Sequence, residues 1–198
     1  MVVNGLTAYQ MLHGSAKVRA GQTVLVLGAS GGVGTILVQL ARLAGVRVIG
    51  TASPRHHEAL RALGAEPIDY HDSDLAARVR ELTPGGVDAV FDHLDDKTPV
   101  LLTFMVLLTK LAYWNYLPTG KHASFYNVWS GAGKPGSVKR AAFVARIRND
   151  LTPVLGLLRD GKLTARIAAR YPLTEVAAAM ELSESSSRTA LGKIILVP

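Results

Sequence analysis

Residues 23–34 read TVLVLGASGGVG, and this stretch decides the fold. Its first five residues are β-branched or apolar, which is typical of a strand buried on both faces. The glycines that follow permit a tight turn and a close approach of the backbone to a ligand. From Val33 the apolar residues recur at helical spacing, and Gly45 is a typical helix stop. The stretch therefore predicts a strand, a glycine-rich turn and a helix.

The segments downstream repeat this alternation of strand and helix. Strands are predicted at 46–51, 67–70 and 87–91, and helices at 53–64 and 75–82. Strands that alternate with helices in this way indicate an α/β fold, with a doubly wound parallel sheet and helices on both faces. The predicted fold class is a Rossmann-type dinucleotide-binding domain.

After Asp92 the alternation is lost. The remaining predictions are a helix-like stretch at 100–111, a strand at 122–128, a loop at 130–137, helices at 138–148 and 153–158, an extended segment at 163–171, a helix at 174–182 and a strand at 193–197. The helices at 138–148 and 153–158 are predicted to be separate because proline breaks a helix interior. We interpret residues 1–198 as a single Rossmann-like domain with an irregular, insertion-like segment around 95–137.

The glycine-rich turn predicts an anion site. Free N–H groups at the start of a helix bind the diphosphate of a dinucleotide, and glycines let that diphosphate approach the backbone. The strand before the turn and the helix after it favour this interpretation over glycines that serve only packing. A P-loop is excluded because no Gly-Lys-Ser/Thr follows the turn.

The end of the second strand favours NADP(H) over NAD(H). In NAD-selective sites an acidic residue ~20 residues beyond the glycines binds the ribose hydroxyls. No Asp or Glu occurs from Gly28 to His57. Instead Thr51, Ser53 and Arg55 offer hydroxyls and a guanidinium to a 2′-phosphate. The alternative for Arg55 is an ordinary solvated surface charge.

The composition of the chain excludes several kinds of site and disfavours several kinds of partner. The chain has 198 residues and no Cys, which excludes disulfides, thiolate metal sites and a cysteine nucleophile. We expect no bound metal and a cytoplasmic location. The net charge is +7, but the basic residues are interrupted by apolar runs and match no nucleic-acid-binding motif, so no nucleic-acid partner is expected. The apolar stretch 99–111 is shorter than the ~20 residues that cross a bilayer, and surface contact with a membrane is the least favoured interpretation.

Several segments together resemble the zinc-independent quinone oxidoreductase and enoyl reductase branch of the medium-chain dehydrogenase/reductase family. They are NGLTAY at 4–9, VLVLGASGGVG at 24–34, GTASPRHHEALRALGA at 50–65, IDY at 68–70, VFDH at 90–93, YPLT at 171–174 and GKIILVP at 192–198. The glycine spacing also fits short-chain reductases, but no Tyr here is followed by the Lys four residues later that their chemistry needs. Family members carry an N-terminal barrel-like catalytic domain, which normally ends where this chain begins. They also carry a helix and a Gly-rich strand after the Asp92 position, which we do not find here.

The resemblance implies a set of cofactor-binding residues. They are Thr7 beside the nicotinamide, Ser30, Gly31, Gly32 and Val33 at the diphosphate, Ser53, Arg55 and Tyr70 around the 2′-phosphate, and His93 at the border of the cofactor. An ordinary loop histidine is the alternative for His93, and no catalytic residue is assigned.

The expected function is NADPH-dependent reduction of a quinone or an activated C=C, with a hydride moving from the nicotinamide to an electrophilic carbon of a small-molecule substrate. The alternative is a non-catalytic NADP(H)-binding module that acts as a sensor or an assembly partner. The strand predicted at 122–128 has an aromatic residue on each face. We expect it to be an edge strand through which the chain forms a homodimer.

Overall fold

The structure is a computed structural model that describes residues 2–92, 109, 126–185 and 191–198. The chain divides into two compact units, one made of Met1–Asp92 with Gly131–Pro198 and the other of His93–Ser130. Most of the second unit lies outside the described residues. The elements described below belong to the first unit.

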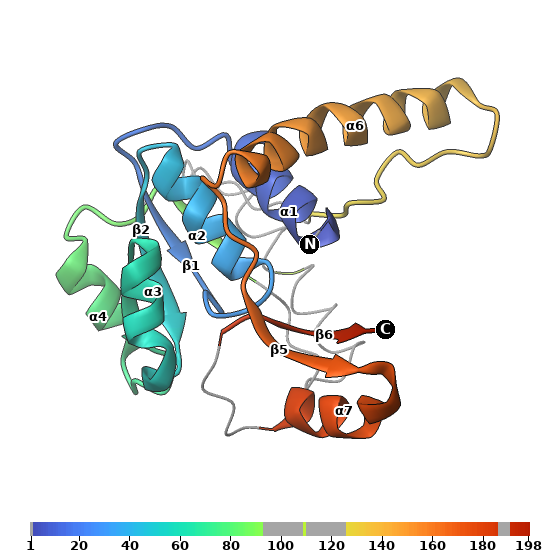
Figure 1. Cartoon of the computed structure of the whole chain (residues 1–198). Coiled ribbons are helices and arrows are strands. Elements are labelled where there is room, and N and C mark those ends of the chain that lie inside the picture. Colours follow the sequence, from blue (N-terminus) through green and yellow to red (C-terminus); the bar gives the residue numbers. More distant parts are fainter. Residues whose placement is uncertain (1, 93–108, 110–125, 186–190) are drawn as a thin grey trace. The chain divides into compact units, whose positions relative to one another are not determined.

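A four-stranded parallel sheet lies at the centre of this unit (Figure 1). Its strands are β1 (Thr23–Val26), β2 (Arg47–Ala52), β3 (Ala65–Asp69) and β4 (Ala89–Phe91), in the order β3-β2-β1-β4. The three pairings are parallel, which confirms the predicted fold class. The order reverses between β1 and β4, and ligands of open α/β sheets bind at such a switch point, outside the carboxyl ends of the strands.

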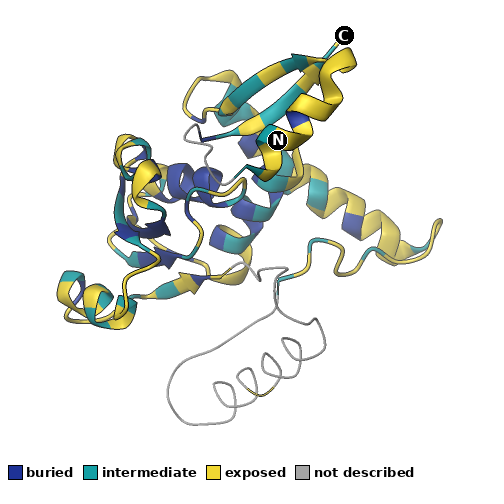
Figure 2. Cartoon of the chain, turned by 90° about the horizontal axis from the view of Figure 1, so that it is seen from below, coloured by how far each residue is buried: buried dark blue, intermediate teal, exposed yellow. Residues whose placement is uncertain are grey.

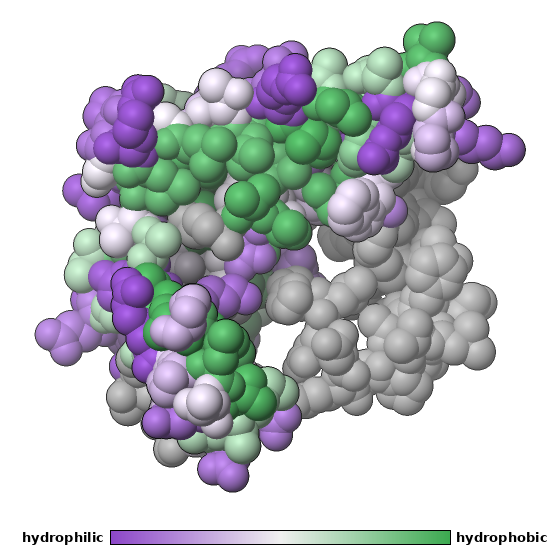
Figure 3. All heavy atoms as spheres, turned by 45° about the vertical axis from the view of Figure 1, so that its right-hand side comes forward, coloured by the Kyte–Doolittle hydropathy of each residue, from purple (hydrophilic) through white to green (hydrophobic). Residues whose placement is uncertain are grey.

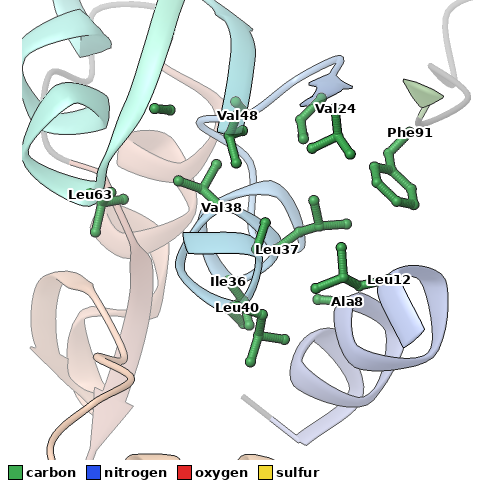
Figure 4. Packing of buried hydrophobic residues seen from close by; sticks show 14 of the residues in the cluster. Ala8, Leu12, Val24, Ile36, Leu37, Val38, Leu40, Val48, Leu63 and Phe91 are labelled. Atoms are coloured by element: carbon green, nitrogen blue, oxygen red, sulfur yellow. The ribbon is translucent and has the colours of Figure 1, made fainter. Parts of the chain in front are cut away.

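Helices cover both faces of the sheet. They are α1 (Val2–Tyr9), continued by the π-helix η1 (Gln10–Ser15), α2 (Gly34–Leu43), the 3-10 helix η2 (Pro54–His56), α3 (His57–Leu63) and α4 (Leu75–Leu82). Side chains alternate along a strand, so Val24 packs with α1, α2 and α3 on one face, whereas Leu25 packs toward α4 on the other. Figure 4 shows Leu37 of α2 between Val24 of β1 and Leu12 of η1.

A salt bridge joins β2 to β3 at the end of the sheet opposite the glycine-rich turn. The Arg47 guanidinium in β2 donates two hydrogen bonds to the Glu66 carboxylate in β3, at 2.7 and 2.8 Å, and a third to the Leu82 carbonyl, at 3.0 Å. The hydrogen bonds from Arg47 hold the pKa of Glu66 below its ordinary value, although partial burial acts in the other direction.

The helix α6 (Val138–Arg159) runs for 22 residues without a break, so the prediction of two separate helices is wrong. Pro153 lies inside it. Packing outweighs the loss of one backbone hydrogen bond, because the neighbouring Val154 is buried against α1, where a Cβ added to Gly5 would lie 2.9 Å from Val154 Cγ1. The Thr152 hydroxyl also donates to the Arg148 carbonyl at 2.7 Å.

The C-terminal region forms a separate two-stranded parallel sheet. Its strands are β5 (Ile167–Pro172) and β6 (Lys193–Val197). Between them in the sequence lie the 3-10 helix η3 (Leu173–Glu175) and α7 (Val176–Glu184). The predicted strand at 193–197 is confirmed, and the helix predicted at 174–182 is found as η3 and α7. Of the segment predicted to be extended at 163–171, only the part from Ile167 is strand.

Buried residues concentrate in α2, β1 and β2, whereas most of α6 is exposed (Figure 2). Hydrophobic side chains also gather on the surface over α1 and α6 and around α7 (Figure 3). The large exposed hydrophobic residues there include Val3, Val144, Leu155, Val176 and Met180. Within the described part of the chain, no helix is long and apolar enough to cross a membrane.

Two predictions fall largely outside the described residues. Of the helix-like stretch at 100–111, only Thr109 is described, and it is helical. Of the strand predicted at 122–128, only residues 126–128 are described, and they are not strand. They lead into a turn in which the Ser130 N–H donates to the Asn127 carbonyl at 3.0 Å.

Candidate functional site

The glycine-rich turn lies at the carboxyl end of β1, and two of its glycines shape the turn itself. Gly28 has a φ of +68°, in the left-handed region that favours glycine. Its carbonyl accepts a hydrogen bond from the Gly31 N–H at 2.9 Å. A Cβ on Gly34 would lie 2.5 Å from the Gly28 carbonyl oxygen, so only glycine fits there.

Thr51, at the end of β2, fixes the turn in place. Its buried hydroxyl accepts a hydrogen bond from the Gly28 N–H at 3.1 Å, and its carbonyl accepts one from the Ala29 N–H at 2.9 Å. The position of Thr51 in the sequence predicts that its hydroxyl contacts the 2′-phosphate. The structure instead uses it to anchor the turn, a role that depends on the pairing of β1 with β2.

The next part of the turn exposes its backbone at the start of α2. Gly31 and Gly32 are exposed, Ser30 is half-buried, and Val33 is the N-cap residue and packs partly against the core. The first turn of α2 has no acidic residue and no side-chain cap. Amide groups at such a helix start lack partners within the helix, and the positive end of the helix dipole favours an anion. The four residues predicted at the diphosphate thus lie together.

A pocket of about 330 Å³ lies beside this backbone. It is lined by the turn and the first residues of α2, by Asn4 of α1, and by two segments around Arg166 and Lys193 at the starts of β5 and β6. None of the described residues that line it is Asp or Glu. A diphosphate fits this arrangement, because the backbone of Gly31 and Gly32 is accessible and the pocket side chains include two cations.

Three residues that line the pocket are not predicted from the sequence: Asn4, Arg166 and Lys193. They come from opposite ends of the chain and reach the turn only because α1 and the β5–β6 sheet pack beside it. No local spacing signals such a juxtaposition.

The residues predicted at the 2′-phosphate lie at the ends of the neighbouring strands. Ala52 of β2 is paired with Asp69 of β3, and the Tyr70 N–H donates to the Ala52 carbonyl at 3.4 Å. Ser53 and Tyr70 therefore follow adjacent strand ends. Ser53 is half-buried, and Tyr70 is half-exposed.

Arg55 follows in η2 and is exposed. Its Nε lies 3.4 Å from Nε2 of the neighbouring His56. The nearest acidic residue after β2 in the sequence is Glu58 in α3. β2 and η2 thus contain no acidic residue, and Arg55 lies in the first turn after the strand. An acidic residue of the neighbouring strand, Asp69 of β3, is paired with Ala52, and its carboxylate accepts a hydrogen bond from the His71 N–H at 3.0 Å.

The two remaining predicted residues are less well placed. Thr7 is half-buried on α1, one turn beyond Asn4, and does not line the pocket. His93 lies outside the described residues.

Comparison with known proteins shows which proteins this chain is similar to. Residues 32–107 match the zinc-binding dehydrogenase family. The chain is 32% identical to the rat synaptic vesicle membrane protein VAT-1 homolog, over all of this chain and 54% of that protein, and 32% identical to a 2-haloacrylate reductase from a Burkholderia species, over all of this chain and 62% of that protein. A quinone oxidoreductase from Pseudomonas syringae has a similar structure, with a TM-score of 0.67 and 29% identity over 99% of this chain and 62% of that one.

These relatives and solved structures are reductases of the medium-chain dehydrogenase/reductase type, and the chain is similar to their nucleotide-binding part. The resemblance inferred from the sequence is confirmed. A mycobacterial protein solved in complex with NADPH has a TM-score of 0.68 and 28% identity over the whole of this chain and 63% of that one.

The chain spans about half the length of the VAT-1 homologs it matches. The alignment with the rat protein extends over 221 positions, more than the 198 residues of the chain, so the rat protein has residues without a counterpart within the aligned part.

Proposed function

We propose that this chain is the nucleotide-binding part of an NADPH-dependent reductase that acts on a quinone or an activated C=C. The observation that carries the proposal is the exposed glycine-rich turn at the switch point of a parallel sheet, beside a pocket lined by no described carboxylate. The names of the relatives support the reaction class, since they include a quinone oxidoreductase and a 2-haloacrylate reductase.

The chain's own residues would bind and orient the cofactor. The backbone N–H groups of Gly32 and Val33 would hold the diphosphate at the start of α2, while the Gly31 N–H donates to the Gly28 carbonyl and closes the turn. Ser53, Arg55 and Tyr70 would surround the 2′-phosphate. When bound, the nicotinamide supplies the hydride, and the protein supplies binding, orientation and electrostatics.

NADPH is the proposed cofactor because β2 and the residues directly after it carry no carboxylate to bind the ribose hydroxyls, and the Asp69 carboxylate on β3 already accepts a hydrogen bond from the His71 N–H. We expect NADPH to bind at least tenfold more tightly than NADH. One power of ten corresponds to about 1.4 kcal/mol, and a hydrogen bond to a charged group typically contributes ~1.5 to 3 kcal/mol. A single contact from Arg55 is therefore sufficient.

Replacing Arg55 tests the phosphate site. Arg55→Ala should weaken NADPH binding about tenfold and leave NADH binding nearly unchanged, because only NADPH carries the 2′-phosphate. Titration calorimetry with both cofactors measures the effect. The matched control is Arg61→Ala, which removes an exposed arginine of the following helix α3. It should change neither affinity. A parallel loss of both cofactors in Arg55→Ala would show that Arg55 has another role.

Turnover is tested by following NADPH oxidation over a panel of quinones and enones. Oxidation that depends on one of these substrates, and that Gly32→Val abolishes, would support a reductase. NADPH binding without turnover by any of them would favour the alternative, a non-catalytic NADP(H)-binding module.

A further inference from the structure

The helix α6 carries arginine and aliphatic side chains along one face. Because α6 continues through Pro153 without a break, residues spaced three or four apart share a face over its whole length. One such series, which we call the arginine stripe, consists of Arg140, Val144, Arg148, Leu151, Leu155 and Arg159. It is about 28 Å long, at 1.5 Å per residue. The two separate helices predicted from the sequence would not align these side chains.

The arginine stripe is open to solvent along most of its length. Val144 and Leu155 are 41% and 48% exposed, and all three arginines are exposed. Leu151 is half-buried, because it also packs against the hydrophobic core. The C-terminal half of α6 lies beside α1, and its N-terminal half extends beyond α1 (Figure 1). Hydrophobic side chains on this part of the surface are flanked by hydrophilic ones (Figure 3).

The charge around the arginine stripe favours a negatively charged partner. Residues 131–149 include five lysine and arginine residues and no aspartate or glutamate. The first acidic residue after them, Asp150, lies on the side of α6 that faces η1, where its carboxylate accepts a hydrogen bond from Gln10 Nε2 at 2.6 Å. The N-terminal half of α6 is therefore cationic.

Two of the three arginines are not neutralised by a carboxylate. In the described part of the chain, no salt bridge joins Arg140 or Arg148 to an acidic residue. Arg159, at the C-terminal end of the stripe, forms a salt bridge with Asp160 at 3.0 Å. The charge available to a partner thus lies toward the end of α6 that extends beyond α1.

The surface of an anionic bilayer fits these side chains better than a nucleic acid or an acidic peptide. Nucleic-acid sites combine cations with polar or aromatic side chains, whereas Val144 and Leu155 are aliphatic. A peptide helix binds in a groove, whereas the exposed face of α6 is convex. Aliphatic side chains suit the boundary between headgroups and acyl chains, and long arginine side chains reach lipid phosphates from there. Clusters of about four to eight basic residues on a surface helix are typical of binding to anionic lipids.

We propose that the arginine stripe binds the surface of a bilayer that contains anionic phospholipids, with α6 lying along that surface. Arg140 and Arg148 contact lipid phosphates, and Val144 and Leu155 contact the outer part of the acyl chains. This surface lies outside the pocket, so its function does not depend on cofactor binding. The proposal departs from the sequence-based expectation of no membrane contact, because the stripe forms only when the helix is continuous.

Flotation of the full chain with lipid vesicles tests the proposal. The chain should bind vesicles of phosphatidylcholine mixed with phosphatidylglycerol at least tenfold more tightly than vesicles of phosphatidylcholine alone, and added salt should weaken that binding. Arg140→Gln combined with Arg148→Gln should weaken it about tenfold, and Leu155→Ser should weaken it severalfold. The matched control is Arg61→Gln combined with Lys162→Gln, which makes the same change in net charge at exposed positions outside α6 and should have little effect.

The outcomes that overturn the proposal are distinct. The substituted positions are exposed, so urea unfolding should show that each variant stays folded. No binding to the anionic vesicles, or equal binding to both vesicle compositions, would contradict it. Equal binding by the double arginine variant and the unmodified chain would place the contact elsewhere. If Leu155→Ser binds as tightly as the unmodified chain and soluble polyglutamate displaces the chain from vesicles, the stripe is a site for an acidic polypeptide and the lipid proposal fails.

Discussion

Gly32 and Gly34 belong to the same turn but meet different atoms. The space beside Gly32 is bounded by the ends of the Asn4 and Lys193 side chains, which can move. The space beside Gly34 is bounded by backbone atoms of Gly28 and Ala29, between 2.5 and 2.9 Å from an added Cβ, which cannot move without deforming the turn.

This difference predicts two distinguishable variants. Gly32→Val should abolish dinucleotide binding and keep the stability of the fold nearly unchanged, because its side chain enters the pocket. Gly34→Val should lose binding and also lose about 1 to 3 kcal/mol of unfolding free energy, the usual cost of overpacking. Calorimetry and urea unfolding measure the two effects. Unchanged affinity in Gly32→Val would show that the ligand does not bind at this turn.

At the residue scale, only the site residues that lie close together in the sequence were predicted from it. The glycine-rich turn was predicted because its residues are contiguous and lie between a strand and a helix. The anchoring role of Thr51 and the position of Lys193 were not predicted, because each depends on a contact with a distant segment. For the same reason, the predicted proximity of Ser53 and Tyr70 came only from the family resemblance, and the pairing of β2 with β3 now supplies its structural cause.

Pro153 in α6 shows how packing overrides a local preference. We expect Pro153→Ala to raise the free energy of unfolding by about 1 to 3 kcal/mol, because it restores a backbone hydrogen bond inside the helix and removes the clash of the ring. Urea unfolding checks this. Pro135→Ala, in the loop before α6, is the control and should not stabilise the chain. A Pro153→Ala variant less stable than the unmodified chain would mean that the proline geometry is needed for packing against α1.

The salt bridge between β2 and β3 predicts a pH dependence. The pKa of Glu66 is lowered in the folded state by its hydrogen bonds to Arg47. This pair therefore stabilises the fold above the ordinary carboxyl pKa, and the contribution is lost as the pH falls through the lowered pKa. Both side chains are nearly half exposed, so Glu66→Gln should cost at most about 1 kcal/mol at neutral pH.

Urea unfolding at several pH values measures this dependence. The difference between Glu66→Gln and the unmodified chain should disappear in acid, and Glu66→Gln should have little further effect in an Arg47→Met background. A difference that persists at low pH would show that the glutamate stabilises the sheet by packing and not by charge.

At the scale of elements, the predicted strands and helices of residues 23–91 correspond to β1–β4, α2–α4 and η2. The apolar residues that set their periodicity are mostly buried or half-buried in the fold, so the local sequence was sufficient to predict these elements. α1 was not predicted, since its segment contains Gly5 and reads weakly as a helix. It forms where its buried face packs against α2 and α6, and that packing is not visible in the local sequence.

At the scale of the whole molecule, self-association stays a prediction. The strand proposed as the contact, 122–128, lies mostly outside the described residues, and its described part is not strand. Light scattering at micromolar concentration should give the mass of two chains, and Phe125→Lys should reduce it to one. A mass of one chain for the unmodified protein, independent of salt, would contradict the homodimer.

The central claim is that the glycine-rich turn binds a dinucleotide and that the end of β2 selects NADPH. Titration calorimetry of the unmodified chain with NADPH and with NADH tests both parts in one measurement. We predict a dissociation constant for NADPH at least tenfold below that for NADH, a difference of about 1.4 kcal/mol. Equal affinities for the two cofactors would contradict the selection by Ser53, Arg55 and Tyr70, and binding of neither would contradict the claim altogether.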